Sequence, residues 1–219
     1  VYGEQYLSDI DEDIVFKSPG IRYDVPELVE AKSRGVVITS EMEVFFQVCP
    51  CPVIAVTGSD GKTTTTTLLA EMLRAAGKTV WVGGNIGKPL LPEVGRMAPS
   101  DWAVVELSSF QLMDMDRSGH IAVVTNLAPN HLDVHKDMAE YVEAKEHVFA
   151  YQSEGDILIL NRDHEITRSF APGAPGQVRW FSRRERPERG VFLEDGVIYR
   201  ATPEGVRELM AQRDILLPG

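Results

Sequence analysis

Short apolar runs, each bounded by turn residues, recur along the chain and alternate with segments of helical periodicity. Seven of these runs are predicted to be strands, at residues 14–16, 36–38, 53–56, 79–82, 102–107, 121–126 and 156–161. Helices are predicted between them, at residues 25–33, 41–47 and 138–151, with a further helix directly after residue 63. Such alternation is typical of an α/β fold with a mostly parallel sheet and flanking helices.

The helix after residue 63 carries apolar side chains at the spacing of one helical face. Its apolar positions are Leu68, Leu69, Met72, Leu73 and Ala76, and Gly77 supplies a left-handed stop behind them. We expect this face to pack against the sheet.

Two prolines, at positions 50 and 52, mark a linker that divides the chain. Residues 1–48 are predicted to be a Rossmann-like strand–helix–strand remnant of an N-terminal domain, with an N-terminal hairpin extension as the alternative. Residues 49–219 are predicted to be a central domain that includes a small antiparallel meander. The meander is predicted from three β-like runs at residues 178–181, 191–193 and 197–199.

Composition and charge limit the classes of partner. Acidic residues outnumber basic ones by 33 to 22, a net charge of -11, which argues against a nucleic-acid partner. No apolar run approaches the roughly 20 residues that a membrane span needs. Cys49 and Cys51 are too close for an unstrained bridge and predict reduced thiols in a cytoplasmic protein. The absence of a charged and apolar leader suggests no export.

A glycine-bearing segment at residues 57–63 lies between a predicted strand and a predicted helix. It places Lys62 and Thr63 at the start of the helix, where free backbone N–H groups favour anions. The sequence therefore predicts a short variant of the phosphate-binding loop, with Lys62 on phosphate and Thr63 on Mg²⁺. Asp60 is expected to point outward or to lie near a divalent cation, because its carboxylate would repel phosphate. A glycine-rich turn with one surface lysine is the alternative.

Polar side chains follow the carboxyl ends of the other predicted strands, where ligands gather in open α/β sheets. Asn85 follows the glycine pair at residues 83–84, and Glu106 lies near the end of an otherwise apolar strand. A buried carboxylate needs a cation, which we predict to be Mg²⁺, with a structural salt bridge as the alternative. His131 also follows a strand, and Lys145 comes from the helix after it.

Five segments together resemble the Mur ligases of peptidoglycan synthesis. They are residues 57–63, 83–87, 106–112, 130–133 and 141–145, and their order and spacing extend the resemblance over residues 14–161. The resemblance implies a P-loop-type sheet and an ATP-dependent amide ligase. The Ser-Ser-Phe-Gln-Leu run at 108–112 and the Ser-Pro-Gly turn at 18–20 favour the members that add D-glutamate to UDP-N-acetylmuramoyl-L-alanine through an acyl phosphate.

The alternatives are another Mur-type ligase, an enzyme like folylpolyglutamate synthase, and a non-catalytic P-loop nucleotide-binding module. A switch protein of the last class needs a base-specific loop such as Asn-Lys-x-Asp, which the sequence lacks.

The resemblance also implies a role for each matching residue. The implied catalytic residues are Lys62, Glu106, His131 and Lys145, the last carbamylated by CO₂. The implied ligands of two Mg²⁺ ions are Thr63, Glu106, His131 and carbamylated Lys145. ATP would be bound by Gly58, Ser59, Asp60, Gly61, Lys62, Thr63, Thr64 and Asn161. The nucleotide substrate would lie along Asn85, Ser108, Ser109 and Gln111, with its uridine diphosphate near Ser18, Pro19 and Gly20.

The sequence departs from the family pattern in two residues and in length. Asp60 stands where asparagine is more usual, and Val134 stands where arginine is common. The family has three domains and needs a much longer chain, so the resemblance implies that residues 1–48 come from a UDP-binding domain and that the D-glutamate-binding domain is missing. We therefore expect a monomeric fragment that binds ATP weakly and has no amide-ligase activity alone.

Overall fold

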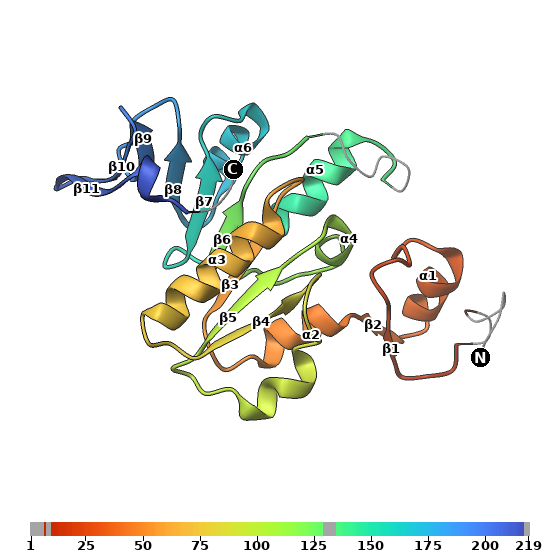
Figure 1. Cartoon of the computed structure of the whole chain (residues 1–219). Helices are drawn as coiled ribbons and strands as arrows, with labels where there is room; N and C mark the ends of the chain where they lie inside the picture. Colours follow the sequence, from red (N-terminus) through yellow and green to blue (C-terminus); the bar gives the residue numbers. More distant parts are fainter. Residues whose placement is uncertain (1–6, 8–9, 129–134, 217–219) are drawn as a thin grey trace.

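The structure is a computed structural model that describes residue 7 and residues 10–128 and 135–216. Among these residues the strands form two sheets, a two-stranded one near the N-terminus and a nine-stranded one in the body of the molecule. The N-terminal unit and the last strands lie at opposite sides of the body (Figure 1). The predicted α/β fold with a mostly parallel sheet is confirmed.

The N-terminal unit is a strand, a helix and a strand. β1 (Ile14–Phe16) and β2 (Val37–Thr39) pair in parallel, and α1 (Pro26–Ser33) connects them. Leu28 and Ala31 are the buried side chains of α1. Parallel strands need a crossover connection, so the alternative of an N-terminal hairpin is wrong and the strand–helix–strand arrangement is confirmed.

The body is built on a sheet with the strand order β11-β10-β9-β8-β7-β6-β3-β5-β4. β3 (Val53–Thr57) lies between β5 (Trp102–Glu106) and β6 (Ile121–Val124). β4 (Val80–Gly84) lies at one edge, and β7 (Ile157–Asn161) continues the parallel series beyond β6. Successive strands are thus added first on one side of β3 and then on the other. In open α/β sheets such a switch point opens a ligand-binding crevice at the carboxyl ends of the strands.

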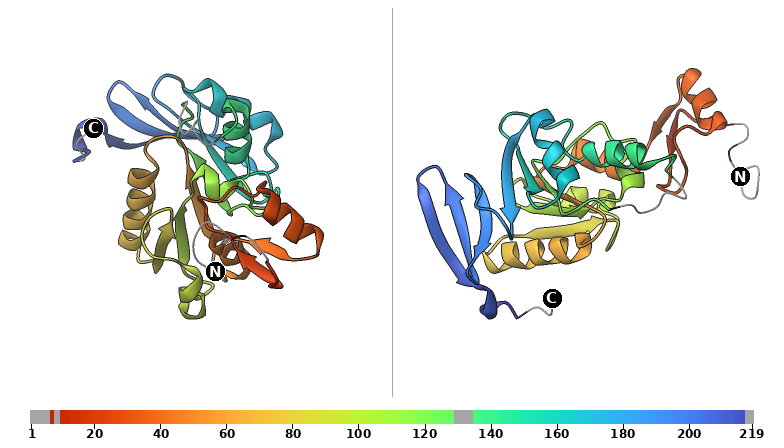
Figure 2. Two further views of the ribbon diagram at one scale, coloured as in Figure 1. Left: turned by 90° about the vertical axis from the view of Figure 1, so that its right-hand side faces the viewer. Right: turned by 90° about the horizontal axis from the view of Figure 1, so that it is seen from above.

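Helices cover both faces of this sheet (Figure 2). Of the helices that the structure describes, α3 (Lys62–Ala75) alone covers one face, and it packs on the smaller of two apolar clusters. The helices of the other face, which share the larger cluster, are α2 (Glu41–Val48), α4 (Ser109–Leu112), α5 (Met138–Glu146) and α6 (Glu165–Ser169). The 3₁₀ helices are η1 (Leu91–Arg96), η2 (Ala171–Gly173) and η3 (Gln212–Asp214). Within the described part of the chain, no helix has the length and apolar character needed to cross a bilayer.

The buried face of α3 differs from the predicted one. Leu68 and Met72 are exposed, whereas Thr66 and Ala70 are fully buried against the sheet. Small side chains at these two positions let the helix lie close to the strands, and this turns the larger neighbours toward solvent. The prediction held only for the part of the face that includes Leu69 and Leu73, which pack on the smaller cluster.

The C-terminal strands extend the sheet in an antiparallel arrangement. β9 (Gly190–Glu194), β10 (Val197–Thr202) and β11 (Gly205–Ala211) pair as two successive hairpins, so a small meander is confirmed. Its membership differs from the prediction, because β8 (Gln177–Ser182) pairs in parallel with both β7 and β9. The third strand of the meander is β11, which the sequence did not predict. Its side chains are exposed along nearly the whole strand, so they lack the alternation that marks a half-buried strand in a sequence.

Candidate functional site

The loop between β3 and α3 follows the carboxyl end of β3 and contacts the end of β6. Gly58 has a φ of 148°, and a Cβ at this position would lie 1.9 Å from Thr125 Oγ1. The Ser59 and Asp60 N–H groups donate to Asn126, the first to its carbonyl oxygen and the second to its Oδ1, at 2.9 Å each. The loop is therefore pinned to the segment after β6, at a distance that only glycine allows at its start.

The N-terminus of α3 opens toward this loop without a side-chain cap. Its N-cap residue is Gly61; α1 and α6 also lack a capping side chain, whereas α2, α4 and α5 each have one. The backbone N–H groups of the first turn and the helix dipole are therefore free to favour an anion. Lys62 lies across the loop, and its Nζ donates to the carbonyl oxygens of Gly58 at 3.0 Å and Ser59 at 2.8 Å. Helix end and lysine together have the geometry that the predicted phosphate-binding loop requires.

The Asp60 side chain is exposed, as expected for a carboxylate that has to avoid phosphate. Its backbone holds the loop instead, because its carbonyl oxygen accepts from Thr125 Oγ1 at 2.7 Å and from Asn126 Nδ2 at 3.2 Å. The negative charge at this position therefore lies outside the loop.

Glu106 ends β5 and is only 2% exposed. Its Oε2 accepts from the Thr63 hydroxyl at 2.7 Å, and its Oε1 accepts from the Asn85 amide at 2.8 Å. Strand register explains this meeting, since Glu106 pairs with Val56 of β3 and Gly84 of β4. Both partners of the carboxylate are neutral, which argues against the alternative of a structural salt bridge and leaves its charge available to a cation.

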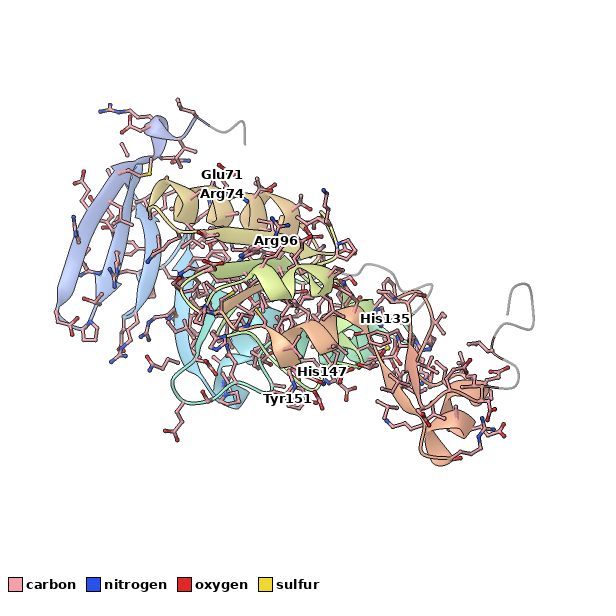
Figure 3. The ribbon with its side chains drawn as sticks, turned by 90° about the horizontal axis from the view of Figure 1, so that it is seen from below. Glu71, Arg74, Arg96, His135, His147 and Tyr151 are labelled. Carbon is pink, nitrogen blue, oxygen red and sulfur yellow. The ribbon has the colours of Figure 1, made fainter. Side chains whose placement is uncertain are left out.

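Replacing Glu106 with glutamine is expected to weaken Mg²⁺-nucleotide binding by about tenfold, or about 1.4 kcal/mol. The metal-free protein should melt at the same temperature or higher, because the amide can still bond to Thr63 and Asn85 while a buried charge is removed. Calorimetry with MgATP and a thermal melt in EDTA measure the two effects. Glu71→Gln, on the exposed side of α3 beside Arg74, is the control (Figure 3). A large loss of stability without metal would show a structural role instead.

Lys145 comes from α5 and is also only 2% exposed. Its Nζ donates to Thr57 Oγ1 at 2.9 Å and to the Gly58 carbonyl oxygen at 3.3 Å, so it lies against the loop between β3 and α3. Burial, and after it the charge of Lys62, lowers the pKa of Lys145 to about 7, while Glu106 acts in the opposite direction. A large share of this amine is therefore neutral near pH 7, and a neutral amine is the form that reacts with CO₂.

A cavity of about 210 Å³ lies beside the loop and brings several of the predicted residues together. It is lined by Gly58, Ser59, Lys62, Asn85, Ser108, Ser109, Phe110, Tyr141 and Lys145. Larger cavities, of about 610 and 460 Å³, lie between the N-terminal unit and the end of α4 and on the strands β7 to β10. Two more, of about 640 and 260 Å³, lie on the C-terminal strands. None of these four is lined by a residue of the loop, so the smaller cavity is the candidate site.

Two predicted residues support this site from outside the cavity. Gln111 Oε1 accepts from the Ser108 backbone N–H at 3.0 Å and completes a capping box at the start of α4. Asn161 Nδ2 donates at 2.9 Å to the carbonyl oxygen of Thr125, the residue that holds the loop. Both contacts are structural, and a direct contact of either residue with a ligand stays a prediction.

The remaining predicted residues are not gathered at the cavity. Exposed positions are Thr64, in the first turn of α3, and the turn after β1, made of Ser18, Pro19 and Gly20. His131 lies outside the described residues. Within the described ranges, no three His, Cys, Asp or Glu side chains come together as a metal site. Thr63 and Glu106 nevertheless offer the hydroxyl and carboxylate oxygens that Mg²⁺ takes beside a nucleotide phosphate.

The sequence analysis missed the side chains that hold the loop in place. Ser59 Oγ lies 2.9 Å from the Tyr141 hydroxyl and accepts from the Ala128 N–H at 2.9 Å. Thr125 and Asn126 directly follow β6, so the strand-end rule that selected Glu106 would also have found them. Tyr141 carries no such signal, because it belongs to α5.

The mostly parallel sheet, the uncapped helix end and the loop lysine define a P-loop-type α/β domain. The Mur ligase middle domain matches residues 56–194, which is more than half of the chain. The chain belongs to the Mur ligase family.

Curated relatives named UDP-N-acetylmuramoylalanine--D-glutamate ligase match most of the chain. The one from Acetivibrio thermocellus is 52% identical over 218 residues, covering 99% of this chain and 47% of the relative. The one from Clostridium kluyveri is 54% identical over 194 residues, covering 88% of this chain and 42% of the relative. The chain therefore spans about half the length of these relatives.

A solved structure confirms the fold. The UDP-N-acetylmuramate:L-alanyl-gamma-D-glutamyl-meso-diaminopimelate ligase from Neisseria meningitides matches with a TM-score of 0.62 at 17% identity. The match covers 97% of this chain and 71% of that structure.

Proposed function

We propose that this chain is the nucleotide-binding part of an ATP-dependent ligase that joins D-glutamate to UDP-N-acetylmuramoyl-L-alanine. The observation that carries this proposal is the loop itself, where Lys62 and the uncapped end of α3 meet the hydrogen-bonded pair of Thr63 and the buried Glu106. The name of the curated relatives specifies the acceptor and the amino acid.

In the proposed reaction, ATP phosphorylates the terminal carboxylate of the nucleotide substrate, and the amine of D-glutamate then displaces phosphate to form the amide. Lys62 and the first turn of α3 hold the ATP phosphates. Thr63 and Glu106 would hold Mg²⁺, which would neutralise phosphate charge when bound. A second Mg²⁺ is proposed on His131 and Lys145.

The second metal requires carbamylation of Lys145, because a lysine cation repels Mg²⁺ whereas a carbamate offers oxygen ligands. Its burial and its pKa of about 7 support this step by supplying the neutral amine. The nucleotide substrate is proposed to enter the 210 Å³ cavity at Asn85, Ser108 and Ser109.

The proposal extends to the rest of the protein. We propose a monomeric cytoplasmic enzyme in which residues 1–48 belong to a UDP-binding domain and residues 49–219 to the central domain. α2 contributes Met42 and Phe45 to the core of the body, so its packing associates it with the central sheet although it precedes residue 49. The expectation that this stretch alone lacks ligase activity stays a prediction.

The test uses the complete gene product with UDP-N-acetylmuramoyl-L-alanine, MgATP and D-glutamate. We expect phosphate release together with a D-glutamyl product detected by mass spectrometry, and no such product with L-glutamate. ATP hydrolysis without amide formation would favour the non-catalytic nucleotide-binding module. Thermal stabilisation by a folate, in place of the UDP compound, would favour an enzyme like folylpolyglutamate synthase.

A further inference from the structure

His135 is a buried histidine two residues before the N-cap of α5, and it packs behind residues that line the candidate cavity. It is 2% exposed, stacks on Phe110 at 5.3 Å with an interplanar angle of 7°, and meets the edge of Tyr141 at 5.2 Å. Its Nε2 lies 2.8 Å from Ser109 Oγ. Phe110, Tyr141 and Ser109 all line the cavity, so His135 supports three parts of its wall.

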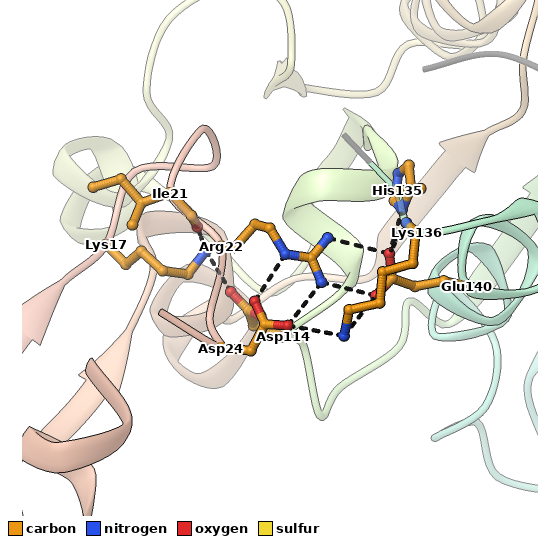
Figure 4. Close-up of polar contacts among 8 residues, drawn as sticks. All are labelled: Lys17, Ile21, Arg22, Asp24, Asp114, His135, Lys136 and Glu140. Carbon is orange, nitrogen blue, oxygen red and sulfur yellow. Dashed lines mark hydrogen bonds and ion pairs between the residues drawn. The ribbon is translucent and has the colours of Figure 1, made fainter. Parts of the chain in front are cut away.

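The other ring nitrogen of His135 faces a carboxylate. Nδ1 lies 3.5 Å from Oε2 of Glu140, a distance at which the two attract each other electrostatically. Glu140 is fixed by the N-terminal unit, because Arg22 donates to Oε1 at 2.8 Å and to Oε2 at 3.1 Å. Asp24 and Lys136 complete this ion network, which is drawn in Figure 4. A continuous set of contacts therefore runs from the N-terminal unit through Glu140 and His135 to Ser109.

The network determines which ring nitrogen of His135 carries the proton. Hydrogen bonding to Arg22 lowers the pKa of Glu140 to about 2, so this side chain is an ionised acceptor. Nδ1 then carries the proton that faces it. Burial lowers the pKa of His135 and favours the neutral ring, despite the opposing effect of Glu140. Nε2 of a neutral ring protonated at Nδ1 is an acceptor, so the Ser109 hydroxyl donates to it.

We propose that His135 is a positioning residue, held by Glu140 and Arg22, which fixes the Ser109 hydroxyl as an acceptor for a donor group of the nucleotide substrate. This rests on the proposed function, because the ligand of the cavity is taken to be UDP-N-acetylmuramoyl-L-alanine. Its geometric basis is that the Ser109 hydroxyl donates its single proton to Nε2, so that toward the ligand Oγ can act only as an acceptor. The arrangement also makes substrate binding depend on Arg22, which belongs to the N-terminal unit.

The decisive variant is His135→Phe, which keeps the ring that stacks on Phe110 and removes both nitrogens. In the complete gene product we expect about tenfold weaker binding of UDP-N-acetylmuramoyl-L-alanine by calorimetry, with MgATP binding unchanged. His135→Gln, whose amide reaches the position of Nε2, should recover part of the loss. Ser109→Ala should show the same loss of affinity for the UDP compound. The double variant, with His135→Phe as well, should bind it no more weakly than either single variant.

The matched control is His147→Phe. His147 caps the other end of α5, apart from His135 (Figure 3), where its Nδ1 lies 2.9 Å from the Leu112 carbonyl oxygen and its ring meets Tyr151. Neither His147 nor Tyr151 lines the cavity. This variant should bind the UDP compound as the wild type does. Arg22→Met tests the proposal independently of any change at the buried ring, and we expect it to weaken binding of the UDP compound selectively as well.

Each outcome decides between the two proposals. If the wild type binds the UDP compound and both His135→Phe and Arg22→Met bind it equally well, the positioning role is overturned and the proposed function stands. An equal loss in His147→Phe would also overturn the role, because a general packing effect would then explain it. If the wild type binds MgATP but not the UDP compound, the proposed function fails and the positioning role fails with it.

Discussion

Replacing Lys62 with alanine is expected to weaken MgATP binding by about 100-fold, because a charge-assisted hydrogen bond is worth roughly 1.5 to 3 kcal/mol. The Nζ atom already lies over the loop, bonded to the Gly58 and Ser59 carbonyl oxygens, and a phosphate at the end of α3 would take over these bonds. The fold should survive, since Lys62 is half-buried and its removal opens no space in either apolar cluster.

Calorimetric titration with MgATP measures this effect, and a thermal melt of the same variant checks the fold. Lys78→Ala is the control, because Lys78 is an exposed lysine beyond the other end of α3. Unchanged nucleotide affinity in Lys62→Ala would overturn the assignment of a phosphate-binding loop and favour a plain glycine-rich turn.

The second large effect concerns stability. Replacing Lys145 with methionine is expected to raise the free energy of unfolding at pH 6 by about 2 to 4 kcal/mol, because one unit of pKa shift corresponds to about 1.4 kcal/mol. The pKa of Lys145 is about 7 in the folded chain, against an ordinary value of 10.5. Part of the gain is offset by lost hydrogen bonds to Thr57 and Gly58, worth about 1 kcal/mol each.

The sign of the pH dependence follows from proton binding. Between about pH 7 and 10.5 the unfolded chain holds more protons at Lys145 than the folded chain does, so wild-type stability rises with pH in this window. Below pH 7 both states are protonated and the cost of burying the charge is fully present. The advantage of Lys145→Met should therefore be largest at pH 6 and shrink steadily toward pH 10.

Urea unfolding at several pH values, in buffer free of CO₂, measures this difference. The buffer matters because carbamylation would remove the buried cation from the wild type. Lys78→Met, at an exposed position, should show no such pH dependence. A lower stability of Lys145→Met at pH 6 would mean that the amine stabilises the loop more than its burial destabilises the fold.

The sequence predicted much of the site because the carboxyl ends of parallel strands meet at one edge of a sheet. Lys62, Asn85 and Glu106 are far apart in the chain, yet each follows or ends a strand, and the register of β3, β4 and β5 brings them together. Lys145 could be noted only as a charge on the helix after His131, and its role came from the family resemblance, because a residue within a helix gives no strand-end signal.

Other features depend on tertiary contacts that no local pattern encodes. The exposure of Met72 depends on how closely α3 approaches the sheet, which the small residue Ala70 permits. The contact between Arg22 and Glu140 joins the β1–α1 connection of the small sheet to α5, which connects β6 and β7 of the large sheet. The sequence around each of these two residues looks like that of an ordinary surface charge, so it does not predict their contact. The extent of the meander could not be predicted because the side chains of β11 are exposed on both faces.

The central position of β3 has a consequence for the order of events during synthesis on the ribosome. Both neighbours of β3 are made after it, β5 at residues 102–106 and β6 at residues 121–124. The contacts that pin Ser59 and Asp60 come later still, from Thr125 and Asn126. The candidate site therefore cannot take its final form until the chain beyond residue 126 has left the exit tunnel, and until β6 has emerged the apolar strand β3 lacks one of its two neighbouring strands.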